Sequence, residues 1–148
     1  MIEEVRKMRT NKKGFTLIEL LAVIVILAII ALITVPVVIK IINNAKKGAA
    51  EDSAYGVVES AKLFWASNQS NFEVNYDTVV FTCNDEKKCS VTTPSGLTGD
   101  LDISGTKPTG GTITITNGDV TVAGLVFGEY SCSTDQSDTN KITCSTNS

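Results

Sequence analysis

One carboxylate, Glu19, lies at the edge of the most apolar stretch of the chain. From Leu20 to Ile39 no side chain is charged, and Phe15, Leu17 and Ile18 just before Glu19 are apolar too. By insertion scales, an acidic residue in the middle of a membrane costs about 2.5–3.5 kcal/mol, and such residues usually have a partner and a function. Glu19 is therefore the first candidate for a functional side chain, and its chemistry would be that of an ion pair.

Catalytic chemistry is not favoured by the remaining residues. The sequence has no histidine, which removes the commonest acid–base side chain and metal ligand. A nucleophile–base pair cannot be assembled without it, and the acidic side chains are scattered along the chain as solubilising charge. We expect no enzyme, no catalytic residue and no cofactor, and a membrane-anchored exoenzyme has no support.

The four cysteines, Cys83, Cys89, Cys132 and Cys144, all follow the apolar stretch. Their spacing lacks the short-spaced pairs of a structural zinc site, and no histidine could complete one. Disulfides suit an exported domain with a small core. The sequence thus predicts disulfides and no metal.

The apolar stretch is long enough to cross a membrane, since a span needs about 20 residues. Residues 1–14 carry five basic and two acidic side chains, whereas residues 15–148 carry eight basic and fourteen acidic ones. A basic flank before an apolar stretch stays in the cytoplasm. We therefore expect a single membrane pass with an extracellular head.

Three simpler interpretations of the stretch compete. A secretory signal peptide has an apolar core of about 7–15 residues and then a cleavage site of small residues. Here the core is longer, and the only such site, KKGAAE at 46–51, follows a polar turn. A plain signal-anchor helix leaves Glu19 unexplained. A buried core helix is excluded because the chain is too small to bury a segment that is apolar on every face.

Beyond Ile39 the helical pattern continues with an amphipathic face. Apolar residues recur at steps of three and four, which predicts one buried stripe; its members are Ala50, Ala54, Val57, Val58, Ala61, Phe64 and Trp65. One helix is expected from Phe15 to about Asn68, with Pro36 bending or locally melting it. Gly48 and Gly56 weaken it by about 1 kcal/mol each relative to alanine.

After Asn68 the sequence period becomes two, which is typical of strands. Asn117-Gly118 predicts a two-residue hairpin with Ile115 opposite Val120 and Ile113 opposite Val122. Further strands are expected at 77–83, 101–104 and 125–132. We predict an α+β fold, in which the long helix packs on a small antiparallel sheet of three or four strands.

The segment KKGFTLIELL, residues 12–21, resembles the processing site of type IV pilins and pseudopilins. Precursors of that family have a short basic leader ending in glycine, then a mature chain that begins with phenylalanine and has glutamate at its fifth position. Gly14, Phe15 and Glu19 match those positions, and Pro36 falls where many pilins have a helix-kinking proline. The resemblance covers roughly residues 10–45; the head resembles the family only in general architecture.

The resemblance implies a pilin-like fold and cleavage between Gly14 and Phe15 by a membrane prepilin peptidase, with N-methylation of Phe15. Glycine suits such a site because it lets the chain lie extended against the protease. The resemblance further implies that an inner-membrane platform and its ATPase assemble the mature chains into a homo-oligomeric helical filament. The expected segments are then a leader at 1–14, a membrane or filament-core helix at 15–39, an amphipathic helix at 40–68 and a head at 69–148.

Cleavage would also supply a partner for Glu19. The new α-amine of Phe15 on a neighbouring subunit could pair with it, and at about 4 Å and an effective dielectric near 20 the gross attraction is about 4 kcal/mol. That value is comparable to the insertion cost, so the carboxylate favours assembled subunits. The alternative is that Glu19 complements only its own helix dipole or its own amine.

Within the family, a surface pilus subunit is the leading interpretation, and a type II secretion pseudopilin or a DNA-uptake pilin remains open. Asp135 and Asp138 lie in a loop where a calcium-binding pseudopilin could hold its ion, but two carboxylates are thin support. Residues 69–148 carry four lysines and ten acidic side chains, so we expect no direct nucleic-acid binding by the head.

Four cysteines allow three disulfide connectivities. We predict Cys83–Cys89 and Cys132–Cys144, because each pair is the nearest in sequence and brackets a polar, turn-rich stretch. The second pair also resembles the family's habit of closing a C-terminal loop with a disulfide. Cys83 and Cys132 both end predicted strands, however, so a bridge between neighbouring strands stays open at this point.

Overall fold

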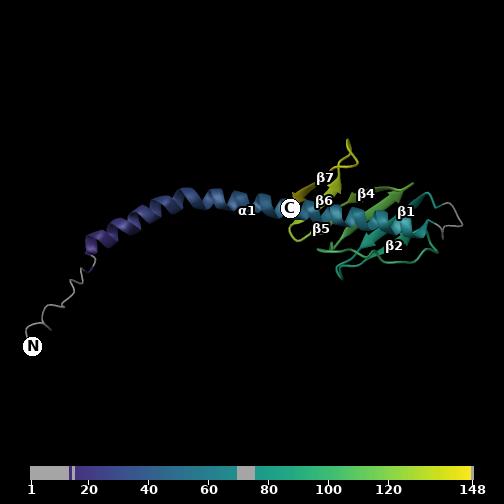
Figure 1. Ribbon diagram of the computed structural model, residues 1–148, viewed down its shortest axis with the longest axis horizontal. Coiled ribbons are helices and arrows are strands. Elements are labelled where there is room, and N and C mark those ends of the chain that lie inside the picture. The colour runs from purple at the N-terminus through teal and green to yellow at the C-terminus, as the bar shows by residue number, and fades with distance from the viewer. Residues whose placement is uncertain (1–13, 15, 70–75, 148) are drawn as a thin grey trace, which may run out of the picture. The chain divides into compact units, whose positions relative to one another are not determined.

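The structure is a computed structural model that describes residues 14, 16–69 and 76–147. Within these residues the chain forms one helix and seven strands (Figure 1). They are α1 (Leu17–Asn68), β1 (Thr78–Cys83), β2 (Cys89–Thr93), β3 (Gly111–Thr116), β4 (Asp119–Ala123), β5 (Leu125–Phe127), β6 (Tyr130–Thr134) and β7 (Ile142–Thr146). The chain divides into two units, Met1–Ile42 and Asn43–Ser148, which are described separately below.

The first unit contains the apolar part of α1. The helix continues through Pro36 without interruption, so the expected local melting does not occur. Proline removes only the hydrogen bond that its own nitrogen would donate. Two residues before Pro36, the hydroxyl of Thr34 donates to the carbonyl of Ile30.

The second unit begins with the amphipathic part of α1, and its buried stripe is the predicted one. Ala50, Ala54, Val57, Val58 and Ala61 are all buried against the strands. The two aromatic residues at the end of the stripe, Phe64 and Trp65, are half-buried and pack on the same core. The ring of Phe64 meets that of Phe81 edge to face, with 5.0 Å between centroids.

The strands form two antiparallel sheets. One has the order β2-β1-β3-β4 and the other the order β5-β6-β7. The hairpin of β3 and β4 has the predicted register, since Ile115 pairs with Val120 and Ile113 with Val122. Its turn residues have positive φ angles, 51° at Asn117 and 91° at Gly118, as a type I′ turn requires.

The prediction of a single sheet with three or four strands was wrong in its details. The stretch 125–132 is not one strand, because Gly128, with φ of 60°, begins a turn that separates β5 from β6. The expected strand at 101–104 does not form. Conversely, β2 and β7 were not predicted. Both are short and rich in serine and threonine, so their apolar alternation is weak.

Other parts of the head cover the two open edges of the four-stranded sheet. At the edge of β2, the amide of Val91 donates to the carbonyl of Gly99 at 3.0 Å, and the amide of Leu101 donates to that of Cys89 at 2.8 Å. Residues 99–101 therefore serve as an edge cover rather than as a strand. At β4, the amide of Val122 donates to the hydroxyl of Thr134 at 2.8 Å. Such cover prevents unwanted pairing with other chains.

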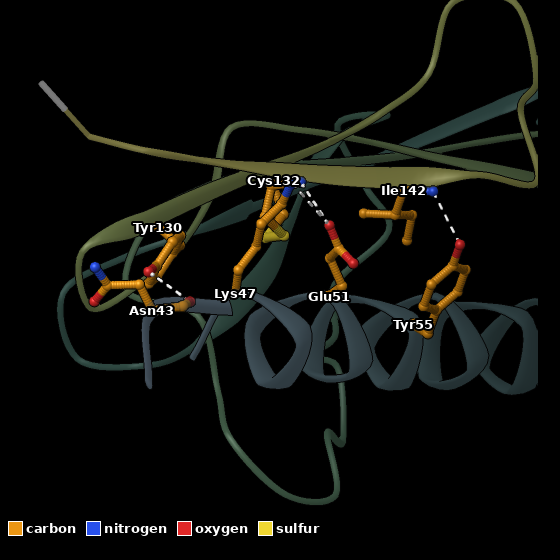
Figure 2. A network of polar contacts seen from close by, with 8 residues as sticks. Asn43, Lys47, Glu51, Tyr55, Tyr130, Cys132 and Ile142 are labelled. Atoms are coloured by element: carbon orange, nitrogen blue, oxygen red, sulfur yellow. Dashed lines mark hydrogen bonds and ion pairs between the residues drawn. A yellow bond between two sulfur atoms is a disulfide. The ribbon is translucent and has the colours of Figure 1, made fainter. Parts of the chain in front are cut away.

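The free edge of β7 faces α1, whose side chains satisfy its backbone (Figure 2). The amide of Ile142 donates to the Tyr55 hydroxyl at 3.0 Å, and the amide of Cys144 donates to Oε1 of Glu51 at 3.4 Å. The hydroxyl of Tyr130 donates to the carbonyl of Asn43 at 3.2 Å. Polar contacts thus fasten the last hairpin to the helix.

Two disulfides link neighbouring strands in the head. Cys83 pairs with Cys89 across β1 and β2, and Cys132 pairs with Cys144 across β6 and β7. These are the pairings that the sequence favoured, and they account for all four cysteines. Each bond closes a hairpin loop, so neither joins the two sheets.

The disulfides are expected to contribute unequally to stability. The loop between Cys132 and Cys144 is the longer one, so removing this bond with paired serine substitutions should lower the free energy of unfolding by about 3 kcal/mol, and removing Cys83–Cys89 by less. Urea unfolding of the mature chain in detergent, followed by near-ultraviolet circular dichroism, measures both. A larger loss from the Cys83–Cys89 pair would contradict the loop-length argument.

Candidate functional site

The start of α1 is closed by a reciprocal pair of side chains, Thr16 and Glu19. Oε2 of Glu19 accepts the backbone amide of Thr16 at 3.0 Å and its hydroxyl at 3.1 Å. In return, the Thr16 hydroxyl accepts the backbone amide of Glu19 at 3.3 Å. This is a capping box, which satisfies amides that the first turn of a helix leaves without partners.

In the single chain Glu19 serves its own helix through this capping box, and its pairing with a neighbouring subunit stays a prediction. Both hydrogen bonds to its carboxylate end on Oε2, and no described residue donates to Oε1. A carboxylate offers about four acceptor positions. Glu19 can therefore cap its helix and still accept a cation from outside.

Thr16 is the residue that the sequence analysis missed. The pattern T-x-x-E immediately before an apolar run is a known signature of a helix start. Because Glu19 was interpreted as a carboxylate within a membrane, it was not predicted to cap its own helix with Thr16.

The expected cleavage site lies directly before the cap. Gly14 is exposed, and among the described residues beyond its chain neighbours no atom lies within 4 Å of the position a Cβ would take. Phe15 lies outside the described residues. An open glycine beside a helix end is accessible to an enzyme that must bind the chain in an extended form.

The helix after the cap presents an uncovered apolar surface. From Leu17 to Ile42 its large hydrophobic side chains are between 46% and 87% exposed. By length and composition this helix can cross a membrane. An apolar surface of this extent requires lipid or other protein around it, which fits anchoring in a membrane.

The loop with the two candidate calcium ligands uses its carboxylates internally. Asp135 accepts the hydroxyl and the amide of Ser137 at 2.7 and 2.9 Å, and Asp138 accepts the amide of Asn140 at 3.0 Å. The hydrogen bonds from Ser137 lower the pKa of Asp135. Among the described residues no group of three or more metal-binding side chains gathers.

Comparison with known proteins gives one match. Residues 9–35 match the family model described as the prokaryotic N-terminal methylation motif. No curated protein and no solved structure gave a match to the chain. The matched segment contains the open glycine, the capping box and most of the uncovered apolar helix. This motif is the class III signal of type IV pilins and pseudopilins, so residues 9–35 are similar to the processing signal of that family.

Proposed function

We propose that the chain is the precursor of a structural subunit of a type IV pilus-like surface filament. The observation that supports this most is the methylation motif at residues 9–35 leading directly into a helix with an uncovered apolar surface. A prepilin peptidase would remove residues 1–14 and methylate Phe15. An inner-membrane platform and its ATPase would then transfer the mature chain from the membrane to a surface filament.

Glu19 would guide this assembly. Its Oε2 stays with Thr16, while Oε1 accepts the methylated amine of Phe15 from a neighbouring subunit. Pairing removes the cost of an isolated carboxylate in an apolar environment. A subunit whose Glu19 pairs with a neighbour's amine is therefore favoured over an unassembled subunit.

Pro36 would influence how the helices pack in the filament rather than interrupt its own helix. It leaves one carbonyl of the preceding turn without its usual donor. In lipid or between packed helices, neighbouring groups must satisfy that carbonyl. The proline would therefore adapt the helix to its neighbours within the filament.

Processing is the direct test of this function. When the chain is expressed with a prepilin peptidase, intact mass measurement should show loss of residues 1–14 and one added methyl group on Phe15. Gly14→Val should remain uncut, because a β-branched side chain hinders the extended backbone that the enzyme needs. Gly48→Val is the matched control and should be cut normally.

Two results would contradict the proposal. One is an uncut wild-type chain in the presence of an active peptidase. The other is cleavage after Ala50, which would indicate an ordinary secretory signal instead.

A further inference from the structure

A groove of about 360 Å³ opens on the head beside α1. Its helix side is formed by Lys46, Ala49, Ala50 and Ser53, and its other side by Thr106 and the turn from Phe127 to Tyr130. The helix residues follow one another at steps of three and four, so they lie on one face of α1. The groove therefore runs along the helix axis, and an elongated partner in it would lie alongside α1.

The floor of the groove consists of small side chains. Ala49 is exposed, Ala50 is buried and Ser53 is half-buried. Small residues on a helix let a second helix approach closely. Buried Phe127 and Tyr130 form an apolar wall opposite. The groove is thus shaped for larger apolar side chains from another helix.

One end of the groove carries an ammonium group without an ion pair. In the described part of the chain Lys46 makes no salt bridge, whereas its neighbour Lys47 pairs with Glu51 at 3.9 Å. Glu129, across the groove, is exposed to solvent. A partner helix that is apolar and carries one carboxylate would complement Lys46.

The first turns of α1 have this composition. They are apolar and exposed, with Glu19 as their one charged residue and its Oε1 open. The spacing matches as well. Glu19, Ala22 and Ile26 follow one another at the same intervals as Lys46, Ala49 and Ser53.

We propose that the groove receives the first turns of α1 from a second copy of the chain, a proposal that rests on the filament function above. Glu19 of the second copy pairs with Lys46, Ala22 lies beside Ala49, and Ile26 packs over Ser53. The helices are parallel because every copy crosses the membrane in the same direction. The Phe15 amine and Lys46 then come from different neighbours and share the free acceptor positions of the Glu19 carboxylate, as a helical polymer allows.

The proposed contact can form only after a subunit has left the membrane. In membrane-resident chains, Glu19 lies toward the cytoplasmic side and Lys46 on the exported side, so the two cannot meet. Crosslinking therefore distinguishes the filament from the membrane pool.

The first experiment uses the double variant Ala22→Cys, Ala49→Cys in the full chain. After mild oxidation with copper phenanthroline, sheared filaments should give a ladder of linked subunits on non-reducing gels, and the membrane fraction should give monomers. The matched control is Ala22→Cys, Ala66→Cys, because Ala66 is also exposed on the helix but does not line the groove. It should give monomers in both fractions.

The second experiment compares neighbouring lysines. Lys46→Gln should lower filament yield about fivefold, the effect of losing one exposed ion pair, and should make yield less sensitive to salt. Lys47→Gln should leave the filament yield within about twofold of the wild-type yield, because Lys47 pairs within its own chain. Glu129→Gln should keep or raise the yield, since it removes a carboxylate opposite Glu19.

The outcomes separate this inference from the filament function. Normal wild-type filaments with no ladder, or equal yields from the two lysine variants, would overturn the groove contact alone. Absence of wild-type filaments and of processing would overturn both. A ladder limited to the filament fraction supports the contact.

Discussion

Glu19→Gln is expected to reduce filament assembly by at least about tenfold while leaving the helix cap and membrane insertion intact. Glutamine at this position can still accept the amide of Thr16, since glutamine serves in capping boxes. It cannot, however, pair with a neighbour's cation. Insertion should be unchanged or improved, because a neutral side chain enters the membrane more cheaply. Yield of sheared filaments and alkaline extraction of membranes measure the two effects.

Thr16→Ala is the matched variant for this prediction. It removes the hydroxyl of the capping box, which costs about 1 kcal/mol of helix stability, but keeps the carboxylate charge. Assembly should therefore fall much less than in Glu19→Gln. Glu19→Leu removes both cap and charge and should assemble no better than Glu19→Gln. Normal filaments from Glu19→Leu would show that the carboxylate serves only its own helix.

Gly111→Ala is expected to have the largest effect on the stability of the head. Gly111 has φ of 104°, and an added Cβ would lie 2.6 Å from the carbonyl carbon of Gly124 and 2.7 Å from Cα of Leu125. These are backbone atoms of the connection between β4 and β5, so they cannot move without disturbing both sheets. Backbone strain together with overlap should cost about 3 kcal/mol or more.

Gly110→Ala is the control for this substitution. The Cβ there would meet only the side chain of Val126, at 3.5 Å, which is an ordinary contact. Thermal unfolding of the mature chain in detergent should show a fall of about 12 °C or more for Gly111→Ala and a change of a few degrees for Gly110→Ala. Similar melting temperatures for the two variants would contradict the structure at this junction.

The extent of the helix and its buried face were predictable from the sequence. Local rules suffice for such features, since the spacing of Ala50, Ala54 and Val57 requires one covered side whatever the covering element is. The same holds for the Asn117-Gly118 hairpin, where the turn residues set the register. The methylation motif at residues 9–35 was also recognisable from the sequence, because it is a linear pattern of neighbouring residues.

The number of strands and their division between two sheets could not be predicted from such local patterns. The stretch 101–104 was predicted to be a strand, but its first residue, Leu101, belongs with residues 99 and 100 to the cover on the edge of β2, and this use depends on where that edge lies in space. The strand β7 carries few apolar residues, and backbone amides on its outer edge donate hydrogen bonds to Tyr55 and Glu51. No local pattern in β7 records a partner that is more than eighty residues away in the chain.

Glu19 shows most clearly which properties of a residue follow from the sequence and which follow only from the tertiary structure. The sequence alone determined that a carboxylate begins an apolar helix and must be paired, because an isolated charge there is costly whatever the fold. The pattern T-x-x-E also indicates that Thr16 pairs with this carboxylate. Only the structure decided that both hydrogen bonds from Thr16 end on one oxygen while the other stays open, and that small side chains at Ala49 and Ser53 face a wall formed by Phe127 and Tyr130. Hydrogen-bond direction and surface shape depend on atoms brought together by folding, and residue types and spacing do not specify them.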